Sequence, residues 1–126
     1  MVGERSTMAR ILLAEDDDSV RIFLARALRR AGHDVCDKGD GDDALAWVSE
    51  HPIDLLLADV VMPGLDGIEL ARRASDMWPQ LRVIFITGFA AVALREAQAM
   101  PREAAVLAKP FHLRQLVSEI DRFLVA

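Results

Sequence analysis

Charged and hydroxyl side chains stand where several apolar runs of the sequence end. Such runs are typical of strands that are covered on both faces of a parallel sheet. The side chains are Glu15 and Asp16 after residues 10–14, Asp59 at the end of 53–59, Thr87 at the end of 81–87, and Lys109 after 104–108. In an open α/β sheet the carboxyl ends of the strands share one edge, and the ligand crevice lies there. We therefore expect these side chains to converge.

Carboxylates held this close repel one another and raise one another's pKa. A hard divalent cation removes that conflict, and oxygen ligands with open water positions suit Mg²⁺. Lys109 supplies a second compensating charge, since a charged group at the end of a buried strand needs a partner. The pattern therefore predicts a Mg²⁺ site with a lysine beside it.

An aspartate beside a metal ion, a lysine and a hydroxyl is a suitable acceptor for a phosphoryl group. The metal ion and the ammonium offset the charge that develops on the phosphoryl oxygens while the carboxylate attacks in line. The hydroxyl of Thr87 would then hydrogen-bond a phosphoryl oxygen. Because that bond exists in only one state, it provides a switch.

Each of these residues also has an ordinary structural interpretation. The acidic run EDDD (15–18) is typical of a solvated helix start, and Asp59 of a loop cap. Lys109 can extend its ammonium from the sheet into water, and Thr87 is a common strand residue. A coincidence at four separate strand ends is much less plausible than any one of these, which favours a functional site.

The rest of the sequence provides five strand–helix units. The expected strands are residues 10–14, 33–38, 53–59, 81–87 and 104–108. The first expected helix carries an apolar stripe and is stopped by Gly32; the stripe consists of Val20, Phe23, Leu24, Ala27, Leu28 and Ala31. Three further helices are expected at residues 42–51, ended by Pro52, at 66–78, with capping-box spacing between Asp66 and Glu69, and at 90–100, ended by Pro101. The last helix carries an apolar stripe from Leu113 to Leu124. Strands that alternate with helices imply a parallel sheet with helices on both faces.

Length, composition and charge exclude several classes of protein. The chain has 126 residues, the size of one domain, and its 52% hydrophobic and 28% charged residues indicate a globular chain. No apolar run reaches membrane-spanning length, and the net charge of −5 argues against sequence-independent nucleic-acid binding. The single cysteine, Cys36, excludes an internal disulfide and is typical of a reducing cytoplasm. Residues 1–7 are expected to form a loose tail before one domain, residues 8–126, with no output domain.

The chain resembles the receiver domain of two-component response regulators. The segments that carry the resemblance are LLAEDD (12–17), LLLADVVMPGLDG (55–67), FITG (85–88) and LAKPF (107–111), in that order and spacing. The resemblance covers residues 9–125 and implies a (βα)5 flavodoxin-like fold with strand order 2-1-3-4-5. Longer stretches, ARILLAEDDDSV (9–20) and FITGFAAVAL (85–94), are similar to a single-domain alphaproteobacterial cell-cycle regulator that acts with the ClpXP protease.

The resemblance implies a role for each matching residue. By this resemblance Asp59 is the phosphoacceptor, and Mg²⁺ is bound by Glu15, Asp16, Asp59 and the backbone carbonyl of Val61. Lys109 pairs with Asp59 or with the phosphoryl group. Thr87 is the switch hydroxyl, and Gly88 leaves room for the phosphoryl group. The Lys109–Pro110 bond is expected to be cis, which ends the strand sharply and orients the ammonium.

The chain departs from the family pattern at Val106, where many members carry an aromatic switch residue. The chain therefore lacks an aromatic side chain at this position that could change rotamer together with Thr87. A change at Thr87 would instead reach the surface through the loop that contains Phe89. Phe89 and Val106 are candidate partner contacts on the face made by residues 90–100, 104–108 and the last helix, although Phe89 is as readily a surface filler. Val61 and Phe89 flank the acceptor where other members carry polar side chains, which predicts slow self-dephosphorylation.

The resemblance implies a stand-alone cytoplasmic regulator without enzymatic activity beyond its own phosphorylation and dephosphorylation. A histidine kinase or a histidine phosphotransfer protein would be the donor, and a ClpXP-type protease or its substrates the partner, with placement at the cell pole and recruitment turned off by phosphorylation. A relay or sink without its own output stays open. A haloacid dehalogenase-type phosphatase would need an acid where Val61 stands, and a cap for which the chain lacks length. The scattered histidines, His33, His51 and His112, form no metal motif.

Overall fold

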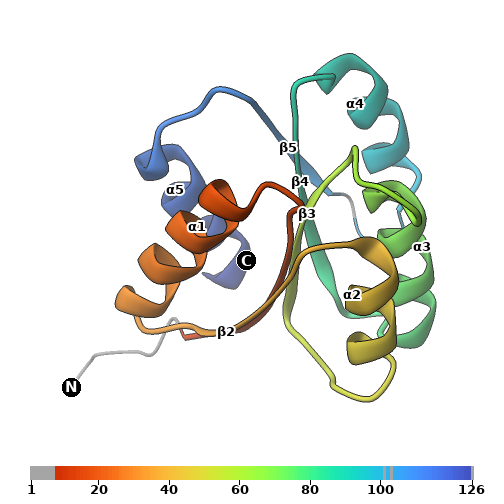
Figure 1. Ribbon diagram of the computed structural model, residues 1–126, viewed down its shortest axis with the longest axis horizontal. Helices are drawn as coiled ribbons and strands as arrows, with labels where there is room; N and C mark the ends of the chain where they lie inside the picture. The colour runs from red at the N-terminus through yellow and green to blue at the C-terminus, as the bar shows by residue number, and fades with distance from the viewer. Residues whose placement is uncertain (1–7, 101, 103, 126) are drawn as a thin grey trace.

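Five parallel strands form a sheet between two layers of helices in the computed structural model (Figure 1). The strand order is β2-β1-β3-β4-β5. Helices α1 and α5 lie on one face of the sheet, and α2, α3 and α4 lie on the other (Figure 1). The predicted α/β fold and the predicted strand order are therefore confirmed.

The structure describes residues 8–100, 102 and 104–125. The elements are β1 (Arg10–Ala14), α1 (Asp18–Arg30), β2 (Asp34–Lys38), α2 (Gly41–Val48), β3 (Leu55–Asp59), α3 (Gly67–Met77), β4 (Arg82–Thr87), α4 (Ala90–Gln98), β5 (Ala105–Ala108) and α5 (Leu113–Val125). The loose tail expected for residues 1–7 lies outside the described residues. Within the described part of the chain, no helix is long and apolar enough to cross a bilayer.

The strands form because their apolar residues alternate between two cores. In β1, Leu12 and Ala14 belong to the core under α2, α3 and α4, whereas Ile11 and Leu13 belong to the core under α1 and α5. Strands β3 and β4 repeat this alternation. Full burial of a leucine contributes about 1.5–3 kcal/mol, and a shift of register by one residue would exchange the two sets. The register is therefore well determined, and so are the residues at the strand ends.

Aspartate side chains cap the first three helices. Asp17, Asp40 and Asp66 accept hydrogen bonds from backbone N–H groups at the starts of α1, α2 and α3, at 3.0, 2.7 and 2.8 Å. The capping box expected between Asp66 and Glu69 is half formed: Asp66 accepts from the N–H of Glu69, but the Glu69 carboxylate binds two arginines of its own helix. An N-cap of this kind contributes about 1 kcal/mol to stability.

Helix α2 ends at Val48, not at His51 as predicted. Two side chains end it, because the Ser49 hydroxyl donates to the Leu45 carbonyl at 2.7 Å and His51 Nδ1 lies 2.7 Å from the Trp47 carbonyl. These side chains satisfy carbonyls of the last turn, so the backbone can leave the helix before Pro52.

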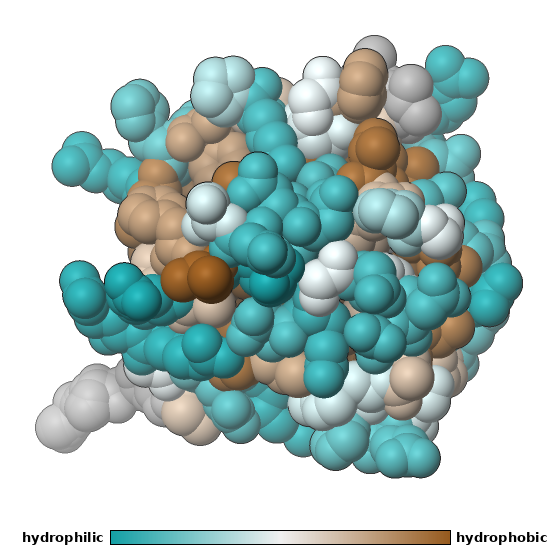
Figure 2. Space-filling view, in the orientation of Figure 1, coloured by the Kyte–Doolittle hydropathy of each residue, from teal (hydrophilic) through white to brown (hydrophobic). Residues whose placement is uncertain are grey.

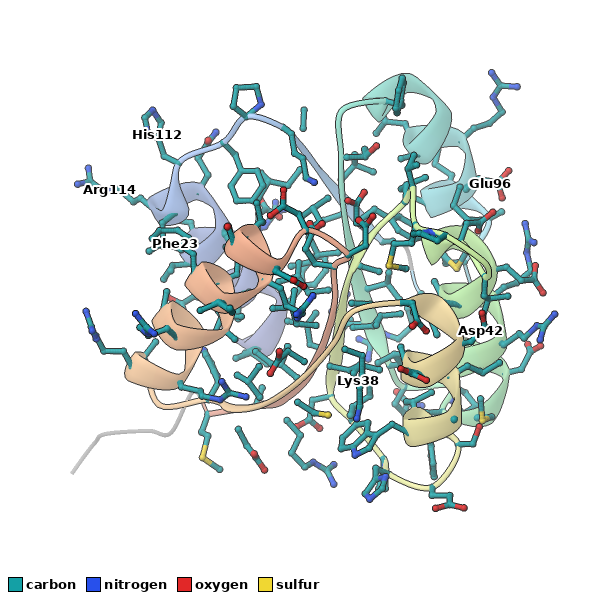
Figure 3. All side chains as sticks on the ribbon, in the orientation of Figure 1. Phe23, Lys38, Asp42, Glu96, His112 and Arg114 are labelled. Atoms are coloured by element: carbon teal, nitrogen blue, oxygen red, sulfur yellow. The ribbon has the colours of Figure 1, made fainter. Side chains whose placement is uncertain are left out.

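Phe23 belongs to the apolar stripe of α1 but does not join the core, since it is 59% exposed. The surface of α1 that contacts the sheet is narrower than the stripe and is formed by Leu24, Ala25 and Leu28. Phe23 instead lines an open groove with Phe111. In Figure 3 its side chain lies on the outer side of α1.

His33 is a buried histidine in the turn between α1 and β2. Its Nδ1 accepts a hydrogen bond from the N–H of Ala9 at 3.0 Å. Burial lowers the pKa of His33, and the carboxylate of Asp121 on α5 offsets only part of that effect. The neutral imidazole is therefore the form that fits the fold, because a protonated Nδ1 could not accept the Ala9 bond.

The free energy of unfolding should decrease as the pH falls below the unfolded-state pKa of His33, 6.5. The folded pKa is the lower one, so the unfolded chain binds the proton first. The stabilisation is complete above the unfolded pKa and is lost as the pH falls through the folded pKa. Urea unfolding of wild type and of His33→Gln checks this, with the exposed His51→Gln as control. Equal pH slopes in wild type and His33→Gln would contradict it.

Candidate functional site

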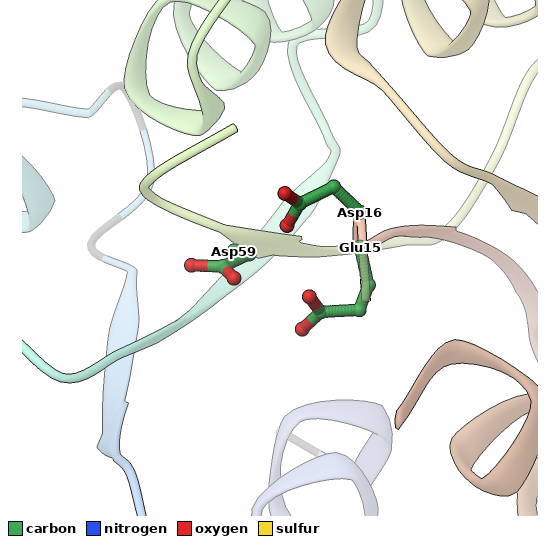
Figure 4. Close-up of side chains that lie close together, drawn as sticks. All are labelled: Glu15, Asp16 and Asp59. Atoms are coloured by element: carbon green, nitrogen blue, oxygen red, sulfur yellow. The ribbon is translucent and has the colours of Figure 1, made fainter. Parts of the chain in front are cut away.

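The side chains at the carboxyl ends of the strands converge, as the sequence predicts. Glu15 follows β1 and is fully buried, Asp59 is the last residue of β3 and is 6% exposed, and Asp16 is exposed. One carboxylate oxygen from each of these three residues lies within 4.8 Å of the others. Figure 4 shows the three side chains gathered at this edge of the sheet. Two strands thus bring three acidic groups to one point.

Lys109 joins two of these carboxylates. Its Nζ lies 3.0 Å from Asp59 Oδ2 and 3.2 Å from Glu15 Oε1. The backbone directs it there: the N–H of Lys109 donates to the Thr87 carbonyl at 2.7 Å, and the following Lys109–Pro110 bond is cis, as the resemblance implies. The ammonium therefore compensates two buried carboxylates at once.

The charges of the site are strongly coupled. Burial raises the pKa of Glu15, and the charge of Asp59 raises it further, although the N–H of Asp17 and the ammonium of Lys109 act in the opposite direction. Burial lowers the pKa of Lys109, but its hydrogen bonds and charge interactions with Asp59 and Glu15 outweigh burial and raise it. Lys109 thus stays charged, and the site holds more carboxylate than one ammonium neutralises.

The acidic cluster fits a hard divalent cation. Its ligand atoms are carboxylate oxygens, which such cations prefer, and Lys109 alone does not neutralise their negative charge. The exposed carboxylate of Asp16 makes the cluster accessible to solvent. Val61, whose carbonyl the resemblance adds to the ligand set, lies two residues after Asp59 and donates its N–H to Asp59 Oδ1 at 3.1 Å. That bond fixes the orientation of the Asp59 carboxylate.

Thr87 and Gly88 border the same edge. Thr87 is the last residue of β4 and is fully buried, and its hydroxyl oxygen accepts a hydrogen bond from the N–H of Phe89 at 2.9 Å. A Cβ added to Gly88 would meet no atom within 4 Å, so open space lies beside Gly88. The side chain of Phe89 is 63% exposed at the start of α4. Thr87 is therefore linked directly to the backbone from which α4 starts.

Sequence reasoning missed two residues that hold the site in place. The Arg21 guanidinium donates to the Glu15 carbonyl at 2.9 Å and pairs with Asp37 at 3.2 Å and Asp18 at 2.7 Å. A Cβ added to Gly67 would lie 2.1 Å from the Asp59 carbonyl oxygen, so only glycine allows α3 to begin against the end of β3. An Asp-Gly pair at a helix start was the available signal for Gly67, whereas no local pattern pointed to Arg21.

The two candidate contact residues differ in exposure. Phe89 is exposed, whereas Val106 in β5 is half-buried and packs against the core under α4. Figure 2 shows apolar side chains gathered over α1 and, beyond a hydrophilic band, over the region of α4. On the neighbouring face, His112 and Arg114 at the start of α5 point away from the sheet (Figure 3). His112 is exposed.

Comparisons with known proteins agree with this geometry. The family model described as "Response regulator receiver domain" matches residues 11–121. The response regulator receiver protein CpdR of Brucella abortus is 56% identical, over 94% of this chain and 99% of that protein. A receiver domain from Methanospirillum hungatei superposes with a TM-score of 0.86 at 25% identity, covering 94% of both chains. The receiver domain of the hybrid histidine kinase CckA superposes with a TM-score of 0.78 at 35% identity, covering 91% of this chain and 98% of that one. The chain belongs to the family of response regulator receiver domains.

Proposed function

We propose that this protein is a phosphoryl switch in which Asp59 accepts a phosphoryl group from a phosphohistidine. The donor is a histidine kinase or a histidine phosphotransfer protein. The observation that carries the proposal is the ammonium of Lys109, 3.0 Å from Asp59 and 3.2 Å from Glu15, beside an open acidic cluster. A carboxylate held between a fixed cation and a cation site is well placed to take up a phosphoryl group.

Each neighbouring group has a task in the transfer. The N–H of Val61 orients Asp59 while a carboxylate oxygen forms a bond to phosphorus and the nitrogen–phosphorus bond of the donor breaks. Lys109 then moves to a phosphoryl oxygen, beside the space next to Gly88. Mg²⁺, when bound by Glu15, Asp16, Asp59 and the carbonyl of Val61, offsets the negative charge of the phosphoryl group.

Thr87 couples the new phosphoryl group to α4. Its hydroxyl oxygen accepts from the N–H of Phe89, which leaves the hydroxyl proton free to bond a phosphoryl oxygen. Movement of Thr87 toward that oxygen would strain or break the bond to Phe89. Because Val106 replaces the usual aromatic residue, we propose that the change travels through this backbone link.

The output is contact with other proteins by a stand-alone domain of residues 8–126. We propose a ClpXP-type AAA+ protease or its substrates as the partner, with phosphorylation ending recruitment and with the protein placed at the cell pole. Identity of 56% to CpdR over nearly the full length of both chains supports this choice, together with the resemblance carried by residues 9–20 and 85–94. The contact surface includes Phe89 and the exposed side of Val106.

A phosphorylated histidine donor tests the transfer. The donor, labelled on its phosphoryl group, is incubated with the chain and Mg²⁺. The label that the donor loses should appear on the wild-type chain, whereas Asp59→Ala should gain no label in the same time. Label on Asp59→Ala at the wild-type level would contradict the assignment of Asp59.

The output is tested by capture of the purified ClpX component of the protease. The unphosphorylated chain should bind it, the chain phosphorylated on Asp59 should bind much more weakly, and Phe89→Ala should bind weakly in both states. The exposed Arg114→Ala serves as control. Equal binding in both phosphorylation states, or none in either, would instead favour a phosphate relay or sink without its own output.

Self-dephosphorylation should be slow, with a half-life of minutes or longer. Val61 and Phe89 are 55% and 63% exposed, and each lies two residues after Asp59 or Thr87. Apolar groups there hinder an attacking water. The double variant Val61→Asn, Phe89→Asn should lose its phosphoryl group faster. The decay of the phosphorylated mass after removal of the donor measures both rates. A wild-type half-life of seconds would rule the prediction out.

A further inference from the structure

A pocket opens at the amino-terminal edge of the sheet, opposite the edge that carries Asp59. Its volume is about 580 Å³, within the range of small-molecule sites. It is lined by the starts of β1 and β4, the loop before β3, the segment before β5 and the end of α5. Leu81 and Ile53 are buried at its floor, and Trp78 and Phe123 are half-buried in its walls. The proposed switch uses none of these residues.

Two arginines in this pocket lack a carboxylate partner among the residues that the structure describes. Arg82 lies over the ring of Phe123, with 4.9 Å between Cζ and the ring centroid, and Arg102 donates to the backbone carbonyl of Gln80 at 3.0 Å. Arg10, which lines the same pocket, pairs with Asp54 at 3.2 Å. The guanidinium groups of Arg82 and Arg102 thus have positive charge that no described carboxylate neutralises.

The positive charges of Arg82 and Arg102 act on each other. Burial lowers the pKa of Arg82, and the positive charge of Arg102 lowers it further. The other described arginines either pair with carboxylates or are exposed to water, as Arg26, Arg30, Arg95 and Arg114 are. A half-buried pair of like charges is stabilised by an anion between them.

We propose that this pocket binds a small organic anion, whose phosphate or carboxylate group is held by Arg82 and Arg102 and whose apolar part contacts Trp78 and Phe123. The planar guanidinium fork matches both kinds of head group and binds them through two parallel hydrogen bonds. The Trp78 Nε1–H donates to the Val48 carbonyl at 2.9 Å, so the indole ring is held in place and offers its apolar surface to a ligand.

Nuclear magnetic resonance of the ¹⁵N-labelled chain tests the proposal in EDTA, which keeps metal from the Asp59 site. The probes are phenyl phosphate, benzoate and inorganic phosphate. One of the two aromatic anions should shift the side-chain N–H signals of Arg82, Arg102 and Trp78 to saturation, with an affinity about tenfold or more above that of inorganic phosphate. The aromatic anion that binds more tightly identifies the head group.

Variants separate a built site from non-specific attraction. Arg102→Ala should weaken binding about tenfold or more. Arg82→Lys should also weaken binding, because an ammonium cannot form the two parallel hydrogen bonds of a guanidinium. The control Arg30→Ala, at an exposed arginine, should not change binding. Unchanged amide signals elsewhere in the spectrum establish that each variant is folded. The proposal is overturned if no probe saturates, if inorganic phosphate binds as well as the aromatic anions, or if Arg102→Ala binds as tightly as wild type.

Discussion

Lys109→Ala is expected to lower the free energy of unfolding by about 2–3 kcal/mol in the absence of Mg²⁺. The ammonium compensates Glu15 and Asp59, which are 0% and 6% exposed, so its removal leaves two buried carboxylates side by side. The loss is smaller than for a fully buried ion pair, because Lys109 is about one-third exposed and Glu15, whose pKa is already raised, can bind a proton. Urea unfolding at neutral pH in EDTA measures the loss.

Lys38→Ala is the matched control for Lys109. Lys38 is the other lysine of the chain and also ends a strand at this edge, but no carboxylate pairs with it among the described residues. It should change stability by much less. Mg²⁺ should restore part of the stability of Lys109→Ala, since it supplies charge to the same carboxylates. Equal losses in the two variants would contradict the role of Lys109.

Gly67→Ala is expected to reduce both stability and phosphorylation. The new Cβ would lie 2.1 Å from the Asp59 carbonyl oxygen and 2.8 Å from its carbonyl carbon, and neither backbone atom can rotate away. Relief requires α3 or the end of β3 to move, at about 3 kcal/mol. The same movement displaces Asp59, the proposed acceptor, so phosphorylation by acetyl phosphate should slow about tenfold or more. Urea unfolding and the rate of mass gain measure the two effects.

Gly88→Ala separates steric damage to the fold from obstruction of the site. A Cβ there would meet no protein atom, so stability should change by less than about 1 kcal/mol. Phosphorylation should nevertheless slow, because the methyl group enters the space proposed for the phosphoryl group. Normal phosphorylation in Gly88→Ala would place the phosphoryl group elsewhere. Normal stability in Gly67→Ala would mean that α3 adjusts without cost.

The fold and the convergence of the site were predictable because they depend on short, regular patterns. Buried strands are continuous apolar runs, and a polar residue at the end of such a run marks the carboxyl edge of a parallel sheet. The sequence alone therefore predicts that Glu15, Asp59, Thr87 and Lys109 lie together. Their chemical roles followed from residue types and from the family resemblance, and those roles stay predictions until phosphorylation is measured.

The missed features depend on contacts between distant parts of the chain. The exposure of Phe23 follows from how much of α1 the sheet can cover, and the early end of α2 from side chains that satisfy its last carbonyls. Arg21 in α1 contacts Glu15 after β1 and Asp37 in β2. The charges of Arg82 and Arg102 interact because two segments that are separate in the sequence fold together. No periodicity within one segment encodes such contacts.

The most direct test of the central claim is intact mass after incubation with acetyl phosphate, with and without Mg²⁺, for wild type and Asp59→Ala. We predict that wild type gains the mass of one phosphoryl group, that the gain requires Mg²⁺, and that Asp59→Ala gains nothing. Lys38→Ala should behave as wild type. A gain that persists in Asp59→Ala, or one that is independent of Mg²⁺, would contradict a phosphoryl switch built on Asp59 and the acidic cluster.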